Sequence, residues 1–114
     1  MNINRSYPDN LSNKQKYQLT MSPETHKMKD AKGTVLEIAA FAEYTDTDKN
    51  GEVREVLAIL TPEGETYATN SPTFQDDFSR MVDMFGDSGV TAIKVISGTS
   101  KAGREFITCA YAGE

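Results

Sequence analysis

The chain has 114 residues, of which 38% are hydrophobic and 25% are charged, and its formal net charge at pH 7 is −5. This length suits one domain with a single core, and the composition excludes a disordered chain. The acidic balance argues against general binding of polyanions, because lysine and arginine supply most of that affinity. The charge is unevenly placed, however. Residues 1–32 carry six basic and three acidic side chains, residues 33–86 carry three and eleven, and residues 87–114 carry three and three.

Several classes of protein are excluded by what the sequence lacks. No apolar run has the length of a membrane span or a signal-peptide core, so we expect a soluble cytoplasmic protein. The one cysteine, Cys109, lies in an apolar run and predicts a buried, unreactive thiol rather than a disulfide framework. The one histidine, His26, has no cysteine or second histidine near it. We therefore expect no metal centre, no cofactor and no enzyme activity.

The first third of the chain is polar. Residues 1–16 are rich in asparagine and have no hydrophobic period, which predicts a flexible arm ahead of a single domain over residues 17–114. Residues 17–21 favour a short strand and residues 22–31 a short helix. The basic residues of this helix are Lys27, Lys29 and Lys32, beside His26. They either contact phosphate or form a solvated polar face, and both interpretations stay open.

Alternation over residues 34–47 predicts a long strand in which Phe41 lies on the outer face between two glutamates. Phe41 is then either a stacking platform or a residue covered by the arm or by a partner. The following turn, Asp46 to Glu52, contains the D-x-D-x-N-G opening of a calcium loop. Because Leu57 stands where that loop needs a glutamate, we predict a hairpin turn that does not bind calcium.

Two more strands are predicted over residues 53–61 and 65–69. In the second of these, Tyr67 either stacks at a binding face or packs in the core with its hydroxyl at the rim. A helix is predicted over residues 72–85, with Ser71 as its cap and Gly86 at its end. Its apolar stripe consists of Phe74, Phe78, Met81, Val82 and Phe85.

The last two strands are predicted over residues 90–97 and 104–111, joined by a loop at 98–103. We expect four residues of this hairpin to face the core: Ile93, Val95, Ile107 and Cys109. The opposite face then carries Lys94, Ile96, Arg104, Phe106 and Thr108. The order of three strands, one helix and two strands predicts an all-β fold, a five-stranded OB-fold barrel whose helix lies between strands three and four, with a short amino-terminal extension.

Residues 33–112 resemble the small OB-fold single-stranded-DNA-binding proteins of bacteriophages and related mobile elements. The resemblance is carried by Tyr67 to Ser71 ahead of the helix and by the hairpin Gly98 to Phe106. Bacterial single-stranded-DNA-binding proteins likewise have a long basic hairpin between strands four and five. The chain differs from those bacterial proteins in lacking tryptophan and an acidic carboxyl-terminal tail, so recruitment of host replication proteins through such a tail is not expected.

The expected function is binding of single-stranded DNA with little sequence preference, in phage or mobile-element DNA replication or recombination in the host cytoplasm. Replication or recombination proteins are further candidate partners, and the chain could be a monomer or a dimer. Stacking is predicted for Phe41, Tyr67 and Phe106, and phosphate contact for Arg54, Lys94, Lys101 and Arg104. The alternative is a small protein-binding module, a phage-encoded inhibitor or adaptor, that uses the acidic surface of residues 33–86.

Overall fold

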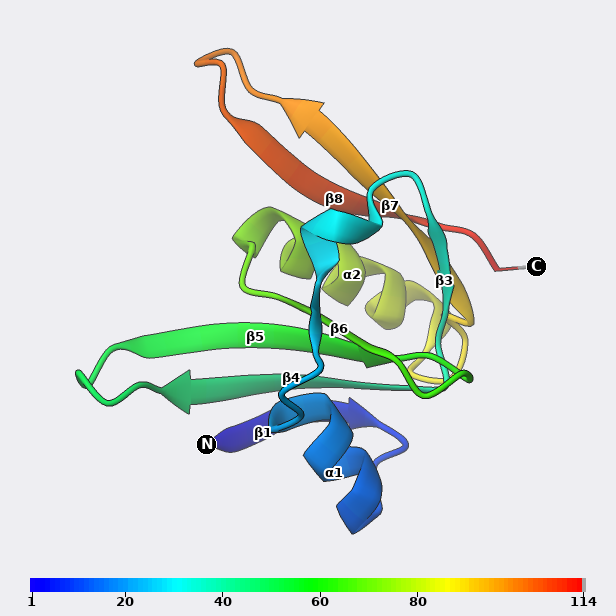
Figure 1. Cartoon of the computed structure of the whole chain (residues 1–114). Helices are drawn as coiled ribbons and strands as arrows, with labels where there is room; N and C mark the ends of the chain where they lie inside the picture. Colours follow the sequence, from blue (N-terminus) through cyan, green and yellow to red (C-terminus); the bar gives the residue numbers. More distant parts are fainter. Residues whose placement is uncertain (114) are drawn as a thin grey trace.

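The computed structural model describes residues 1–113, which form a mostly β structure with two α-helices (Figure 1). The strands are β1 (Asn2–Tyr7), β2 (His26–Lys27), β3 (Val35–Glu37), β4 (Ala40–Thr47), β5 (Val53–Leu60), β6 (Thr66–Thr69), β7 (Ala92–Thr99) and β8 (Glu105–Tyr111). The helices are α1 (Asn13–Thr20) and α2 (Pro72–Phe85), with a 3-10 helix, η1 (Met28–Ala31). No helix in the described part of the chain is long and apolar enough to cross a membrane.

The strands form two sheets, in the orders β1-β4-β5-β6-β2 and β3-β7-β8. All neighbours are antiparallel except β2 and β6, which are parallel. The single strand predicted over residues 34–47 is divided between the sheets. At the division, the Ile38 amide donates to the Thr91 carbonyl and the Ala39 amide donates to the Leu60 carbonyl. One extended run therefore serves both sheets and bends where it changes partner.

The predicted closed barrel is wrong, because the third and fifth predicted strands, β6 and β8, do not pair in the described residues. β6 has only four residues, and the chain leaves it at Asn70 to begin α2. α2 then packs against β8: the Thr108 hydroxyl donates to the Asp77 carboxylate, and the Cys109 thiol donates to the Phe74 carbonyl. The two sheets therefore stay open where β6 and β8 do not pair.

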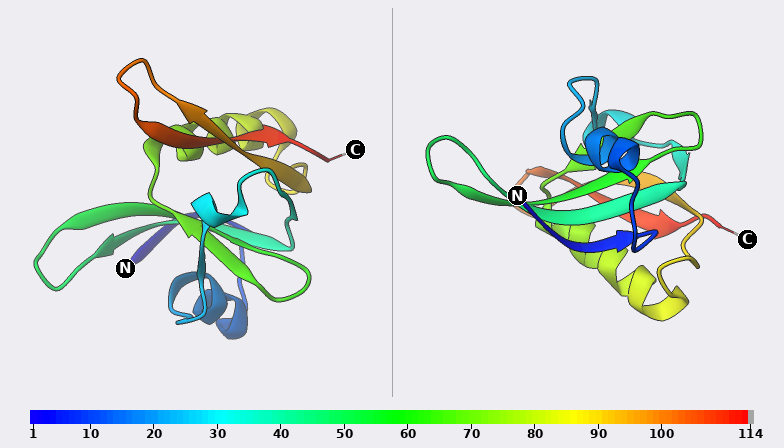
Figure 2. Two further views of the ribbon diagram at one scale, coloured as in Figure 1. Left: turned by 45° about the horizontal axis from the view of Figure 1, so that its top comes forward. Right: turned by 90° about the horizontal axis from the view of Figure 1, so that it is seen from below.

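Helices cover both faces of the five-stranded sheet, with α1 on one side and α2 on the other (Figure 2, right). On the α1 face, Leu19 packs with the small residues Ala42 and Ala58. The core on the α2 face combines both sheets with the helix. It includes Phe41, Leu57, Ile59, Phe74, Phe78, Val82, Ile93, Val95, Ile107 and Cys109. Burial of these side chains is the main stabilising contribution to the fold.

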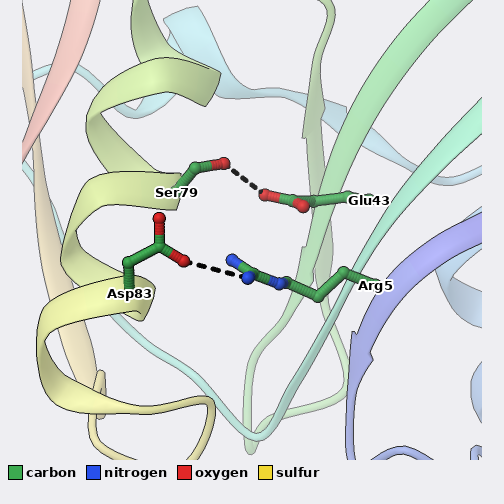
Figure 3. A network of polar contacts seen from close by, with 4 residues as sticks. All are labelled: Arg5, Glu43, Ser79 and Asp83. Atoms are coloured by element: carbon green, nitrogen blue, oxygen red, sulfur yellow. Dashed lines mark hydrogen bonds and ion pairs between the residues drawn. The ribbon is translucent and has the colours of Figure 1, made fainter.

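The helix predicted over residues 72–85 is present as α2 with the predicted ends. The Ser71 hydroxyl accepts a hydrogen bond from the Phe74 amide, and Gly86 has the positive φ of 86° at which a side chain would be strained. Figure 3 shows two polar contacts that fasten α2 to the large sheet. The Arg5 guanidinium lies 2.9 Å from the Asp83 carboxylate, and the Ser79 hydroxyl donates to Glu43 at 2.8 Å.

The first third of the chain differs from the sequence-based prediction. In place of a flexible arm over residues 1–16, β1 pairs with β4 and α1 begins at Asn13. The strand predicted over residues 17–21 lies in α1, and the helix predicted over residues 22–31 is replaced by β2 and η1. The cause is tertiary pairing. Main-chain hydrogen bonds hold β1 to β4 and β2 to β6. Such bonds do not require a hydrophobic period in the sequences of β1 and β2.

Candidate nucleic-acid interface

A cleft of about 800 Å³ opens where β6 and β8 fail to pair. One wall comes from β2 and η1, a second from β5 and β6, and a third from β8. Its lining consists of Lys27, Met28, Lys29, Lys32, Arg54, Val56, Ala68, Thr69, Asn70, Ser71, Pro72, Thr73, Ser97, Glu105, Phe106 and Ile107. The hairpins β4–β5 and β7–β8, which contribute Arg54 and Phe106, both project from the body of the molecule (Figure 1).

The cleft is basic although the chain is acidic. Among the described residues that line it there are four cations and one carboxylate, that of Glu105. The side chain of Lys32 approaches this carboxylate, with Nζ 4.0 Å from Oε2. Arg54 lies 3.5 Å from Asp48, which is outside the lining. The cation of each pair is exposed to solvent, so water and salt screen both pairs and a phosphate can compete for Lys32 and Arg54.

Local structure explains how three lysines reach one wall. His26 and Lys27 pair in parallel with Tyr67 and Ala68 of β6, which fixes the start of the segment. Met28 is fully buried and anchors η1 in the core. The lysines at 27, 29 and 32 are left exposed around this anchor and line the cleft.

Apolar groups lie between the cations. Val56, Ala68 and Ile107 belong to the lining, and so does Phe106, whose side chain is 38% exposed. Binding of a single nucleic-acid strand requires cations along the path of the phosphates. It also requires apolar or aromatic groups on which the faces of the bases can stack. The arrangement therefore suits a flexible strand with accessible bases better than a closed duplex.

The structure brings two of the predicted site residues to the cleft, Arg54 and Phe106. Lys101 and Arg104 are exposed in the loop at the tip of β7–β8, where the Arg104 amide donates to the Ser100 hydroxyl. Lys94 is exposed on β7 but does not line the cleft. The predicted inward residues of this hairpin are confirmed, since Ile93, Val95, Ile107 and Cys109 are all buried.

Phe41 was predicted to stack on a base, and the structure overturns that prediction. Its side chain is fully buried and meets the Phe78 ring edge to face, with centroids 5.0 Å apart and planes at 79°. The alternation that suggested an outer face fails because the sheet has a helix on each side. A ring in this position is part of the core and is inaccessible to DNA.

Tyr67 does not line the cleft either. Its ring stacks on His26, with centroids 5.0 Å apart, and its hydroxyl donates to Glu65 at 3.2 Å. Burial is the largest cause that raises the pKa of Tyr67, and the hydrogen bond to Glu65 raises it further. One side of the ring is thus covered, and a carboxylate that repels phosphate lies at its hydroxyl.

Phosphate contact was left open for three lysines that the structure places on the cleft, Lys27, Lys29 and Lys32. The basic segment suggested this contact, but the predicted helix did not show that the three lysines line one cleft with Arg54. Elsewhere, burial raises the pKa of Cys109 to about 12, which keeps this thiol protonated. The part of the chain that the structure describes contains no group of three or more histidine, cysteine or carboxylate side chains suited to a metal ion.

Comparison with known proteins identifies the family. Residues 14–111 match the family model described as "Phage Single-stranded DNA-binding protein", and this span contains every residue that lines the cleft. No curated protein and no solved structure matches the chain. Because the family model covers most of its length, the chain belongs to the phage single-stranded DNA-binding protein family.

Proposed function

We propose that single-stranded DNA runs through the cleft between η1, β6 and β8, and that the chain binds it with little sequence preference during phage DNA replication or recombination. The family supplies the ligand, single-stranded DNA in a phage. One observation carries the proposed path. A chain of net charge −5 gathers four cations and a single carboxylate on the lining of this cleft.

The lack of preference follows from the kinds of contact that the cleft offers. Lysine and arginine bind phosphates, which are the same for every base. Apolar and aromatic groups contact base faces, and every base has such a face. Phe106 can provide one stacking surface, while Lys101 and Arg104 extend the cationic path to the tip of β7–β8.

The path is tested with a triple variant of the cleft, Lys27→Ala, Lys29→Ala and Arg54→Ala. Its control removes three exposed lysines away from the cleft, by Lys14→Ala, Lys16→Ala and Lys49→Ala, so that both variants have the same net charge. Affinity for fluorescently labelled oligo-dT is measured at several salt concentrations. Removing one cation that binds a phosphate of a single strand lowers the slope of log K against log salt by about 0.7, so the slope of the cleft variant should fall by about 2.

The control should bind as the unmodified protein does. Equal losses of affinity in both variants would mean that general charge, not the cleft, determines binding. If the unmodified protein fails to bind at low salt, the protein-binding module becomes the better hypothesis. Sequence preference is tested by comparing oligo-dT with oligo-dC of the same length, which should bind with equal affinity. A difference in binding free energy of about 1 to 3 kcal/mol per base, typical of bidentate hydrogen bonds to a base, would contradict the proposal.

A further inference from the structure

The sheet β3-β7-β8 has one face in the core and one face exposed. The exposed face carries Val35, Lys94, Ile96 and Phe106, and neither Lys94 nor Ile96 lines the cleft. Three of these residues form an apolar strip in which the exposed fractions of the side chains are 52%, 37% and 38% for Val35, Ile96 and Phe106. Lys94 lies beside Val35 in the register and adds a cation to the strip.

We propose that the DNA strand leaving the cleft continues onto this exposed face, where a base stacks on Phe106 and a phosphate contacts Lys94. This second subsite rests on the proposed function, because it extends the same strand. Continuity is supplied by Phe106, which belongs both to the lining of the cleft and to the exposed strip. Charge complementarity is supplied by Lys94 at one end and by Lys101 and Arg104 at the hairpin tip. The Asp77 carboxylate of α2, which accepts from Thr108 opposite Ile96, borders the strip on its β8 side and confines phosphates to the β7 side.

The Phe106 ring lies over Gly98, and this contact is called the seat of the ring. The two residues are direct partners in the β7–β8 register, and a Cβ atom placed on Gly98 would lie only 2.5 Å from the ring Cζ. The far end of the ring therefore occupies the space in which a side chain at position 98 would begin. A glycine at this point lets the ring lie across β7 with its remaining surface open to a base.

The subsite has a defined extent along β7. Lys94, Ile96 and Gly98 lie on one face of the strand, and four residues at roughly 3.3 Å each separate Lys94 from Gly98 by about 13 Å. Beyond Lys94 the face becomes unfavourable for phosphate, because Glu37 is exposed where β3 pairs with Ala92. Only a few nucleotides fit between the seat of Phe106 and this carboxylate.

The experiment measures affinity for a series of oligo-dT lengths, starting from the shortest that binds. Lys94→Ala should leave the shortest oligomer unaffected, weaken the longer ones, and lower their salt slope by about 0.7. Lys29→Ala in the cleft should weaken every length, and Lys49→Ala on the other hairpin should weaken none. Equal affinity of Lys94→Ala and unmodified protein at all lengths would overturn the second subsite, while the Lys29→Ala result decides the cleft separately.

The seat is tested by two substitutions that keep the charge. Phe106→Leu removes the ring, and Gly98→Ala keeps the ring but displaces it. Both should weaken binding of the longer oligomers by about fivefold or more, the lower end of the effect of removing a base stack. Thermal unfolding reports whether each variant folds. If Gly98→Ala does not, Phe106→Leu is judged together with Lys94→Ala, because Phe106 also lines the cleft and Lys94 does not. If these variants leave DNA affinity unchanged but alter the oligomeric state in sedimentation, the face is a contact between copies and the proposal is wrong.

Discussion

The hairpins β4–β5 and β7–β8 flank the cleft and both project from the body, but they carry opposite charge (Figure 1). Near the tip of β4–β5 the exposed charged residues are mostly acidic: Asp46, Lys49, Glu52, Arg54 and Glu55. At the tip of β7–β8 they are mostly basic: Lys101, Arg104 and Glu105. Their turns also differ, since Asp48 uses its carboxylate to accept from the Asn50 and Glu52 amides, whereas Ser100 uses a hydroxyl to accept from Arg104.

This difference indicates how an acidic protein can bind a polyanion. A strand that follows the cations meets the η1 wall, Arg54 and the basic hairpin, while the acidic hairpin repels it from one side. Net charge is therefore a poor guide to ligand class when cations and carboxylates are segregated on different elements. On the proposed path, the carboxylates of β4–β5 would restrict where the DNA runs, and the turn of β7–β8 leaves Lys101 and Arg104 exposed.

The largest expected effect comes from removing the packing that supports β4 and holds α2 in place. Phe78 is fully buried against Phe41 of β4, on the same helix whose Phe74 carbonyl accepts from Cys109 of β8. Phe78→Ala should lower the free energy of unfolding by about 3 to 5 kcal/mol, because it deletes a buried ring and leaves a cavity. Urea unfolding measures this loss, which is a large part of the stability of so small a domain.

The matched control for this substitution lies on the same helix. Met84 is 78% exposed, so Met84→Ala should change stability by less than about 0.5 kcal/mol. Similar losses of stability in the two variants would show that α2 contributes through its helix propensity and not through the Phe78 contact. The packing of α2 would then not be what holds the two hairpins in place.

A smaller effect is expected from a single charge at each tip. Lys101→Ala on the basic hairpin should lower the salt slope of single-stranded DNA binding by about 0.7, the value for one phosphate contact. Lys49→Ala removes an exposed lysine from the acidic hairpin and should leave the slope unchanged. Fluorescence titration of both variants at several salt concentrations compares the two hairpins directly. If Lys49→Ala reduces the slope as much as Lys101→Ala, the DNA contacts both tips and the proposed asymmetry is wrong.

The fold could be predicted where side chains alone determine the element. α2 has a strong apolar stripe, a serine cap and a terminal glycine, and the structure has the same limits. β7 and β8 alternate clearly, and their register agrees with the predicted inward residues. β1 could not be found this way, since its pairing with β4 depends on the backbone. A signal for α1 was present, because Ser12 and Gln15 form a capping box.

The candidate site was harder to predict because its residues meet only through tertiary pairing. Phe106 and Arg54 were predicted from strand patterns. Lys27 of β2, with Lys29 and Lys32 in and after η1, reaches the cleft through the parallel pairing of β2 with β6. Such a two-residue strand leaves no periodic trace in the sequence. Phe41 was misplaced for a related reason: α1 and α2 cover opposite faces of one sheet, so alternation no longer separates core from surface.

The smallest expected effect is that of calcium on the acidic hairpin. The turn carries the start of a calcium loop, but one oxygen of Asp48 already accepts two amides at 2.8 and 3.0 Å, and the other lies 3.5 Å from Arg54. An ion would have to displace these contacts without the bidentate glutamate that normally completes such a loop. Millimolar calcium should therefore leave the thermal unfolding temperature unchanged. A saturable rise that disappears in Asp46→Ala would contradict this, and would make the acidic hairpin a metal site rather than an electrostatic boundary of the DNA path.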